Sequence, residues 1–296
     1  MSHMTDRYAS LKPTPERDAM NAFPFWWEKI KDAPMGELKL PRTIVIPVPA
    51  DIQRAFYLED SGDFDAIRKF VDTCVQPAIR DAGIGLYFVK NGGYSHKFDA
   101  SRACLPLPSD LAHAVVQIMN EAMIRCGFQY DGTDFLVIRE RIWHNPEQTP
   151  CIYNGLPFRT EFRVFYDFDE KKVIFCKDYW DKNYVRPNLR DRTDRIIYDH
   201  WHPEVYRLYK AHKSNVANAV AKAMSGVEGL SGPWSVDVML DEDQGYWLID
   251  MAVAEMSAYW EDRPGRQTPG QDQSPGHDAE TGGNDGGGHA GTVRLE

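Results

Sequence analysis

The spacing of apolar residues predicts helices in three parts of the chain. Apolar positions recur at helical intervals from Phe64 to Ala82 and from Tyr206 to Met224. A third run starts at Leu111, directly after the capping pair Ser109 and Asp110, and is closed by Gly127. We therefore expect one helix in each of these segments.

Shorter runs of apolar and β-branched residues predict strands between the helices. These runs cover residues 43–48, 83–90, 135–142, 161–168, 172–177, 234–240 and 246–250. The short connections 169–171 and 241–245 indicate that the last four strands form two hairpins. The order of elements predicts an α+β protein with largely antiparallel sheets.

Both ends of the chain differ from its centre in composition. Residues 1–4 (Met-Ser-His-Met) are typical of a cloning scar before a second start methionine. Residues 261–296 hold nine of the 22 glycines and no aromatic residue. Such a segment cannot bury enough apolar surface to offset its ordering entropy, so we expect a disordered tail. The roughly 255 residues between the ends suffice for one large domain or two packed lobes.

Charge and hydropathy exclude some classes of function. A net charge of -10 argues against broad nucleic-acid binding, although it allows a local basic pocket for a phosphate-bearing ligand. The chain has no run of 18 apolar residues and no signal-peptide pattern, so we expect a cytoplasmic protein without membrane insertion. Five scattered cysteines without a CxxC pair are typical of core thiols in a reducing compartment.

The hairpin of residues 234–250 carries two acids, Asp237 and Asp250. Counting across its turn places Asp237 nearly opposite residue 249, and on the face away from its neighbouring valines, so Asp250 is within one position of facing it. Two carboxylates this close repel each other unless a proton or a cation lies between them. Mg²⁺ carrying nucleotide phosphates would satisfy both acids. Alternatively, Asp237 pairs with a nearby arginine and Asp250 is a solvated strand end; the hairpin alone favours neither reading.

Basic residues at strand ends suggest a place for phosphate. Lys90 ends a predicted strand and precedes a Gly-Gly loop that carries Ser95 and Lys97. Glycines let a backbone approach an anion and lysines supply charge, although Asn-Gly-Gly also forms ordinary turns. Arg163 lies in mid-strand, where it serves either a structural ion pair or a bidentate phosphate clamp, and Lys177 ends the partner strand.

The order of these segments resembles the ATP-grasp superfamily. The segments are the strand-end lysine with its Gly-rich loop, then FLVIRERI, TEFRVFYD, VIFCKDYWD, WSVDVML and YWLIDMA. Within the superfamily the chain is similar to the branch of eukaryotic cell-division-cycle assembly factors for translation initiation and their bacterial and phage relatives. The resemblance covers about residues 83–260 and implies two α+β lobes with ATP between them. Residues 5–133 would form the N-terminal region and N-lobe, and residues 134–260 the C-terminal lobe.

The resemblance also implies roles for single residues. The phosphates would be contacted by Lys90, Ser95 and Lys97. Adenine and ribose would be read from the strand that links the lobes, at Arg139, Glu140 and Arg141. Arg163 and Lys177 match the catalytic basic positions facing the phosphates, and Asp237 and Asp250 match the Mg²⁺ ligands. The family commonly has an Asn two residues after the second acid, where this chain has Ala252. Either Glu255 or water replaces that ligand, or metal binding and turnover are reduced.

Two functions fit this resemblance. The first is an ATP- and Mg²⁺-dependent ligase that activates a carboxylate as an acyl phosphate for attack by an amine or thiol. Its acceptor is not identified by the sequence; a basic stretch, either an anion site or a solvated loop, contains Lys182, Arg186, Arg190 and Arg192. The second is a non-catalytic, ATP-binding assembly factor with a protein partner. Its partner-facing aromatic residues, which also suit core packing, would be Trp180, Tyr184, Trp201, Tyr259 and Trp260.

Two readings outside the family explain less. A glycoside hydrolase also needs paired carboxylates, but that function leaves Lys90, Arg163 and Lys177 unexplained. The alternate spacing of His200 and His202 would place two imidazoles on one strand face for zinc, but no third ligand lies nearby in the sequence.

Overall fold

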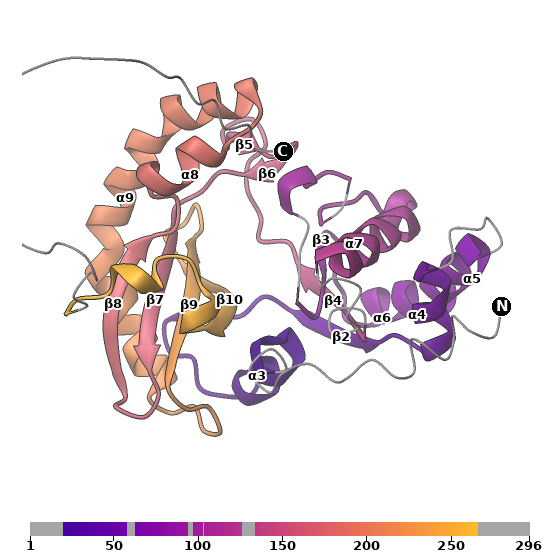
Figure 1. Cartoon of the computed structure of the whole chain (residues 1–296), viewed down its shortest axis with the longest axis horizontal. Helices are drawn as coiled ribbons and strands as arrows, with labels where there is room; N and C mark the ends of the chain where they lie inside the picture. Colours follow the sequence, from indigo (N-terminus) through magenta and orange to yellow (C-terminus); the bar gives the residue numbers. More distant parts are fainter. Residues whose placement is uncertain (1–19, 58–62, 94–96, 103, 126–133, 266–296) are drawn as a thin grey trace, which may run out of the picture. The chain divides into compact units, whose positions relative to one another are not determined.

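The larger of the two main sheets has five strands in the order β1-β10-β9-β7-β8. It belongs to a computed structural model that describes residues 20–57, 63–93, 97–102, 104–125 and 134–265 (Figure 1). Neighbouring strands are antiparallel except for β1 and β10, which are parallel. The strands are β1 (Leu38–Lys39), β7 (Glu161–Asp167), β8 (Lys172–Asp178), β9 (Pro233–Leu240) and β10 (Tyr246–Val253).

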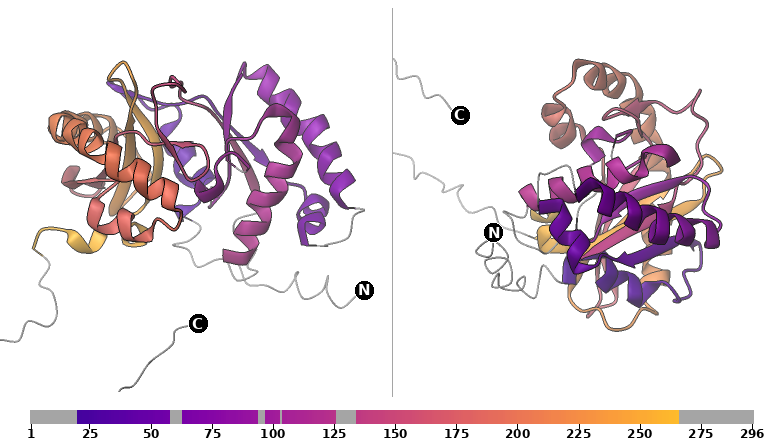
Figure 2. Two further views of the ribbon diagram at one scale, coloured as in Figure 1. Left: turned by 90° about the horizontal axis from the view of Figure 1, so that it is seen from above. Right: turned by 90° about the vertical axis from the view of Figure 1, so that its right-hand side faces the viewer.

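The smaller sheet is antiparallel, with strands in the order β2-β4-β3. Its strands are β2 (Thr43–Pro47), β3 (Tyr87–Asn91) and β4 (Phe135–Glu140). The helices beside it, drawn in purple in Figure 2, are α4 (Ala50–Tyr57), α5 (Asp63–Phe70), the π-turn η1 (Val71–Val75), α6 (Gln76–Asp81) and α7 (Leu111–Arg125). Strand alternation buries Val89 and Ile138 against these helices, which gives this sheet a core of its own.

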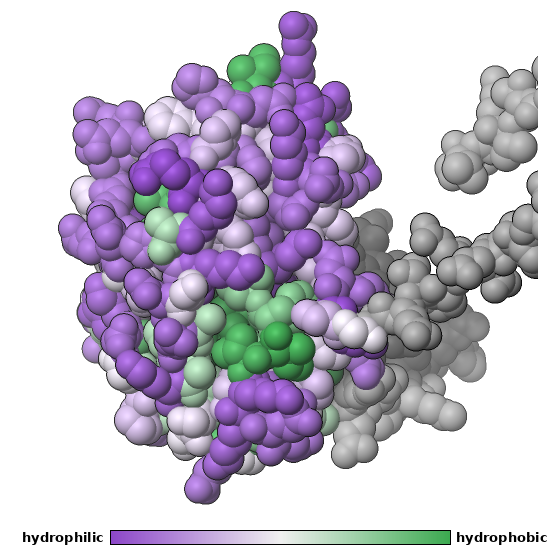
Figure 3. Space-filling model, turned by 90° about the vertical axis from the view of Figure 1, so that its left-hand side faces the viewer, coloured by the Kyte–Doolittle hydropathy of each residue, from purple (hydrophilic) through white to green (hydrophobic). Residues whose placement is uncertain are grey.

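Helix α9 (Arg192–Met224) packs on β7 and β8 of the larger sheet. It starts where the Asp191 carboxylate accepts hydrogen bonds from the next backbone amides, a normal helix cap. A separate small core joins its first half to three short elements: β5 (Cys151–Ile152), β6 (Leu156–Pro157) and α8 (Lys182–Asn188). The face that Figure 3 shows is mostly hydrophilic, with its largest hydrophobic patch near the centre.

Helix α3 (Phe23–Ile30) joins the N-terminal segment to both sheets. The backbone amide of Phe23 donates to the carbonyl of Gly92, just after β3, at 2.7 Å. The Asn21 side chain accepts from the amide of Val253, at the end of β10, at 2.8 Å. The remaining short helical turns are η2 (Lys97–Asp99), η3 (Pro108–Asp110), η4 (Ala254–Met256) and η5 (Trp260–Asp262).

The predicted α+β class with mainly antiparallel strands is confirmed. Several predicted boundaries were wrong: β10 continues past the predicted end at Asp250 to Val253, and two other elements differ more. Helix α9 begins at Arg192, 14 residues before the expected Tyr206, and includes Pro203. Strand β3 begins at Tyr87 instead of Gly83, whose positive φ of 64° belongs to a turn and not to a strand.

Several expectations concern residues outside the described part of the chain. These are the cloning scar 1–4, the helix-ending Gly127, the phosphate-loop residue Ser95 and most of the tail. Glu261 and Asp262, which composition assigned to the tail, form part of the turn η5. Among the described helices, none is both long and apolar enough to cross a membrane.

Candidate functional site

A cleft lies between the two sheets and is lined by residues from both. The smaller sheet contributes Lys90 from β3 and Arg139 from β4, and the larger sheet contributes Asp237 from β9 and Asp250 from β10. About 970 Å³ of space lies among these side chains when the solvent at the open side is included.

Four predicted site residues form one row across four strands of the larger sheet. Asp250 on β10 is paired with Asp237 on β9, which is paired with Arg163 on β7. Arg163 is in turn paired with Lys177 on β8. Directly opposed residues of antiparallel strands present their side chains on the same face. The row therefore carries two negative charges followed by two positive charges.

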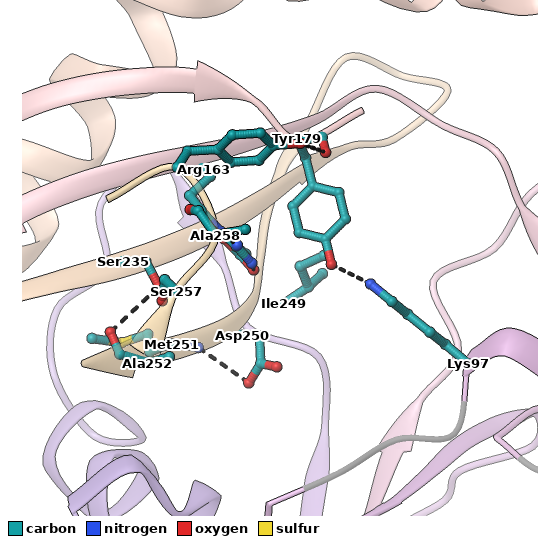
Figure 4. Close-up of polar contacts among 12 residues, drawn as sticks. Lys97, Arg163, Tyr179, Ser235, Ile249, Asp250, Met251, Ala252, Ser257 and Ala258 are labelled. Atoms are coloured by element: carbon teal, nitrogen blue, oxygen red, sulfur yellow. Dashed lines mark hydrogen bonds and ion pairs between the residues drawn. The ribbon is translucent and has the colours of Figure 1, made fainter. Parts of the chain in front are cut away.

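A β-bulge at Ile249 brings Asp250 into this row. Leu248 is paired with Val238 and Asp250 with Asp237, so Ile249 is an extra residue between them. Both Leu248 and Val238 belong to the core, whereas Ile249 and Asp250 line the cleft. Without the bulge, Ile249 would stand opposite Asp237, and Asp250 would point into the core. Figure 4 shows Ile249 and Asp250 together on the strand.

Lys90 contacts Asp250 across the cleft. Its Nζ lies 3.2 Å from Oδ1 and 3.1 Å from Oδ2 of Asp250. The Lys90 side chain is only 8% exposed, whereas that of Asp250 is 43% exposed. The ammonium also lies 5.3 Å from the centre of the Phe23 ring, which favours its charge. The carboxylate of Asp250 is thus partly exposed to solvent, whereas the ammonium of Lys90 is buried against Phe23.

Arg163 holds Asp237 with both arms of its guanidinium. The Nε–Oδ1 distance is 2.8 Å and the Nη2–Oδ2 distance is 2.7 Å. Burial opposes the charge of Arg163, but the carboxylate of Asp237 outweighs it and raises the pKa of Arg163. The pairing with an arginine was one of the two readings that the sequence left open for Asp237.

Lys97, Tyr179 and Glu161 form the wall of the cleft beside this row. Lys97 donates from its Nζ to the hydroxyl of Tyr179 (Figure 4). Burial opposes the charge of Lys97, but Tyr179 and Glu161 attract it, and its pKa is raised. Burial also raises the pKa of Glu161 to about 8, against the attraction of Lys97 and Arg163.

The residues predicted for adenine and ribose have protein partners. Glu140 accepts from Arg42 at 2.7 Å and 3.1 Å. Those hydrogen bonds lower the pKa of Glu140. Arg141 lies 3.1 Å from the ring of His144, and Arg139 donates to backbone carbonyls of β10. All three predicted residues nevertheless line the cleft.

Lys177 lies outside the cleft lining, and so does Arg163, its neighbour in the row. It pairs with Asp262 at 2.8 Å and with Asp181 at 3.6 Å. Its Nζ also lies 5.6 Å from the Tyr259 ring centre.

Sequence reasoning missed several lining residues. Arg159, Met239 and Tyr179 all face the cleft. Arg159 lies just before β7, where no periodic pattern applies. Met239 could have been found, because alternation puts it on the same face as Asp237.

A second hollow adjoins the cleft and shares Lys97, Tyr179 and Trp180 with it. Arg163 also lines this hollow. Of the basic stretch noted in the sequence, only Arg190 reaches the hollow, whereas Arg186 forms a surface pair with Asp199. Two of the aromatic candidates also line the hollow: Trp180, which is buried, and Tyr184, which is exposed.

Candidate metal ligands besides Asp237 and Asp250 are few. The residue two places after Asp250 is Ala252, whose methyl side chain offers no ligand. Within the described ranges, no group of three or more His, Cys, Asp or Glu side chains could hold a metal ion. His200 and His202 lie on helix α9 and not on a strand, and His202 is buried 3.5 Å from Asp178.

The chain is similar to several solved structures. Cdc123 from Schizosaccharomyces pombe is 16% identical, with 86% of this chain and 93% of that chain covered and a TM-score of 0.49. The ATP-grasp ligase PsnB, complexed with minimal precursor, Mg and ADP, is 13% identical, with 84% and 55% covered and a TM-score of 0.34. N5-carboxyaminoimidazole synthetase from Staphylococcus aureus, complexed with ADP, is 12% identical, with 79% and 44% covered and a TM-score of 0.36.

This chain thus spans nearly all of Cdc123 and about half of the two ligases. No protein-family model matches the sequence, and a comparison with curated proteins finds no match. An ATP-grasp ligase is among the structures that this chain is similar to. At these identities and TM-scores, function is argued from the residues of the site.

Proposed function

We propose that this protein binds Mg²⁺ and ATP in the cleft and acts as a ligase of ATP-grasp type. It would activate a carboxylate as an acyl phosphate, which an amine then attacks. The observation that carries the proposal is the row Asp250–Asp237–Arg163, with Lys90 closing it from the opposite sheet. Lys90, Lys97, Asp237 and Asp250 line the cleft, so acids for a hard cation and bases for phosphate oxygens meet there, and Arg163 holds Asp237 from the adjoining hollow.

The residues present suit magnesium in part. Asp250 supplies a solvent-facing carboxylate, and Asp237 lies opposite it on the neighbouring strand. Both oxygens of Asp237 already accept from Arg163, so Asp250 would be the principal protein ligand. Magnesium commonly takes only one or two carboxylates and keeps several waters, so this small set can bind the ion. When bound, the ion would neutralise charge on the phosphates.

The basic residues would orient and neutralise the triphosphate. Lys90 is held at the cleft by its burial and by Phe23, so it needs little reordering to meet an anion. Lys97 lines the same cleft and donates to the hydroxyl of Tyr179. Fixed positive charges in a buried cleft stabilise charge that develops during phosphoryl transfer.

The reaction balances without a redox partner. A carboxylate oxygen of the acceptor attacks the γ-phosphorus, the bond to the β–γ bridging oxygen breaks, and ADP leaves. An amine then attacks the acyl carbon, phosphate leaves, and the amine proton passes to solvent or to a base. The second hollow, which shares Lys97, Tyr179 and Trp180 with the cleft, is where the acceptor would bind.

A second candidate function is favoured by one observation. Asp237 is engaged on both oxygens by Arg163, and Ala252 offers no ligand. This depleted metal set supports a non-catalytic protein that binds ATP to hold a partner-binding conformation. The two functions differ in one testable respect: the ligase transfers the γ-phosphate of ATP, whereas the non-catalytic protein does not.

Single-turnover assays with radiolabelled ATP and pools of carboxylic acids test the ligase proposal. Hydroxylamine, which traps acyl phosphates as hydroxamates, would be added in place of the amine. We expect acid-dependent ADP release and a hydroxamate product. Tight ATP binding with no ADP release in any pool would reject the ligase and leave the holding function.

A further inference from the structure

The bulge in β10 leaves two carbonyl groups that a side chain, not a strand, satisfies. In the part of the chain that the structure describes, β1 pairs with β10 only at Tyr246 and Trp247. Directly beyond that pairing, Nη1 of Arg139 donates to the carbonyl of Ile249, and Nη2 donates to the carbonyl of Leu248 at 3.3 Å. These two residues flank and form the bulge.

The guanidinium of Arg139 is buried, and its geometry suits this contact. The residue is only 4% exposed, and burial lowers the pKa of Arg139 to about 10, although Asp250 opposes that effect. Its charge lies 5.1 Å from the Phe23 ring centre, and its Nε donates to the hydroxyl of Thr43 at 3.2 Å. A rigid planar fork can donate to two neighbouring carbonyls at once, which a lysine cannot do.

We propose that Arg139 is a positioning residue that holds the β10 bulge and thereby keeps Asp250 on the cleft face, opposite Asp237. Bulges re-aim side chains at functional sites, and this bulge decides whether Asp250 faces the cleft or the core. Arg139 belongs to the smaller sheet, so the orientation of the Asp250 side chain also depends on the contact between the two sheets. The use of Asp250 as a magnesium ligand rests on the proposed function, whereas the strand register does not.

Magnesium titrations of the ADP-saturated protein test the effect on the site. We expect Arg139→Met to weaken magnesium binding about 10–100-fold, as loss of a supporting group commonly does. ADP affinity in EDTA should change much less. Arg139→Lys should also lose affinity, because it keeps the charge but not the fork. Arg80→Met, a change at an exposed position of α6, is the control. Wild-type magnesium affinity in either Arg139 variant would overturn the proposal.

Deleting Ile249 distinguishes two possible effects of Arg139 on magnesium binding: its support of the bulge and its positive charge. The deletion restores regular pairing with Asp250 still opposite Asp237, so Arg139 should no longer be needed there. We expect the deletion combined with Arg139→Met to fold and to bind magnesium within a few-fold of wild type, even if Arg139→Met alone does not fold. A combined variant as weak as Arg139→Met alone would contradict positioning.

A crystal structure of Arg139→Met, or of Arg139→Lys if the former does not fold, decides the register directly. We expect Asp250 to leave its place opposite Asp237; an unchanged bulge would overturn the proposal. If the wild-type protein shows no magnesium-dependent ADP binding, the proposed function fails. The crystal structure would still decide the role of Arg139 in that case.

Discussion

The Nζ of Lys90 lies 3.1 Å from Oδ2 of Asp250, and this ion pair links the two sheets across the cleft. Each acid of the row has its own cation: Lys90 for Asp250 and Arg163 for Asp237. The repulsion expected between two neighbouring carboxylates is therefore already relieved by protein groups. Binding of magnesium and triphosphate would replace the Lys90–Asp250 pair, with Asp250 contacting the metal and Lys90 contacting the phosphates.

Replacing Lys90 with Met should weaken ATP binding more than it weakens folding. A hydrogen bond to a charged group is commonly worth about 1.5–3 kcal/mol, which gives the expected loss in binding free energy. The effect on folding should be small, because Asp250 is left facing solvent. Isothermal titration with Mg·ATP and urea unfolding measure the two effects. Lys222→Met, which removes an exposed pair with Glu37, is the control. Unchanged ATP affinity would remove Lys90 from the site.

Breaking the Arg163–Asp237 pair should lower the free energy of unfolding. Both side chains are largely buried, at 12% and 7% exposure, so either change leaves an uncompensated charge. We expect Asp237→Asn and Arg163→Met each to cost about 3–5 kcal/mol in urea unfolding. The double variant should lose clearly less than the sum, because it leaves no buried charge. Additive losses would show that the two residues act independently.

Glu161 should make stability fall as pH rises. Its pKa in the folded protein is raised to about 8, against about 4.5 when unfolded, so between these values only the folded state binds the proton. Stability is therefore lost as pH rises through this window, by up to about 1.4 kcal/mol per pH unit. The Glu161→Gln variant should gain stability relative to wild type from about pH 5 to 8 in denaturant titrations.

Glu140 provides the control of opposite sign. Its pKa is lowered by the hydrogen bonds from Arg42, so its contribution is present at neutral pH and lost as pH falls below its usual range. The Glu140→Gln variant should be destabilised at pH 7 and not in acid.

For the Glu161→Gln variant, a difference in stability from wild type that does not change with pH would show that the Glu161 carboxyl is ionised in the folded state.

The sequence predicted the face of Asp237 but not the exact partner of Asp250. Alternation along 234–240 is a local property and is confirmed by the burial of Val236 and Val238. The bulge at Ile249 is held by Arg139 from a distant segment, so counting across the turn was one residue off. The same limit applies to Lys177, whose partner Asp262 lies beyond the predicted folded region.

The long helix α9 shows a similar limit on a larger scale. Its first half packs on β5 and α8, which are short elements with weak patterns of their own. Helical periodicity was visible only where α9 meets the regular core of the larger sheet. The buried state of Glu161 was equally hidden, because its neighbours Lys97 and Arg159 come from outside β7.

The thermal stability of the protein with and without Mg·ATP tests the central claim most directly. Ligand at 100 times its dissociation constant stabilises a fold by about 2.7 kcal/mol, so we expect a clear rise in melting temperature. Asp250→Ala should remove the magnesium-dependent part of that rise. Asp243→Ala, in the turn of the same hairpin, should retain it. No rise for the wild type at millimolar Mg·ATP, or an equal rise for Asp250→Ala, would contradict a magnesium-nucleotide site in this cleft.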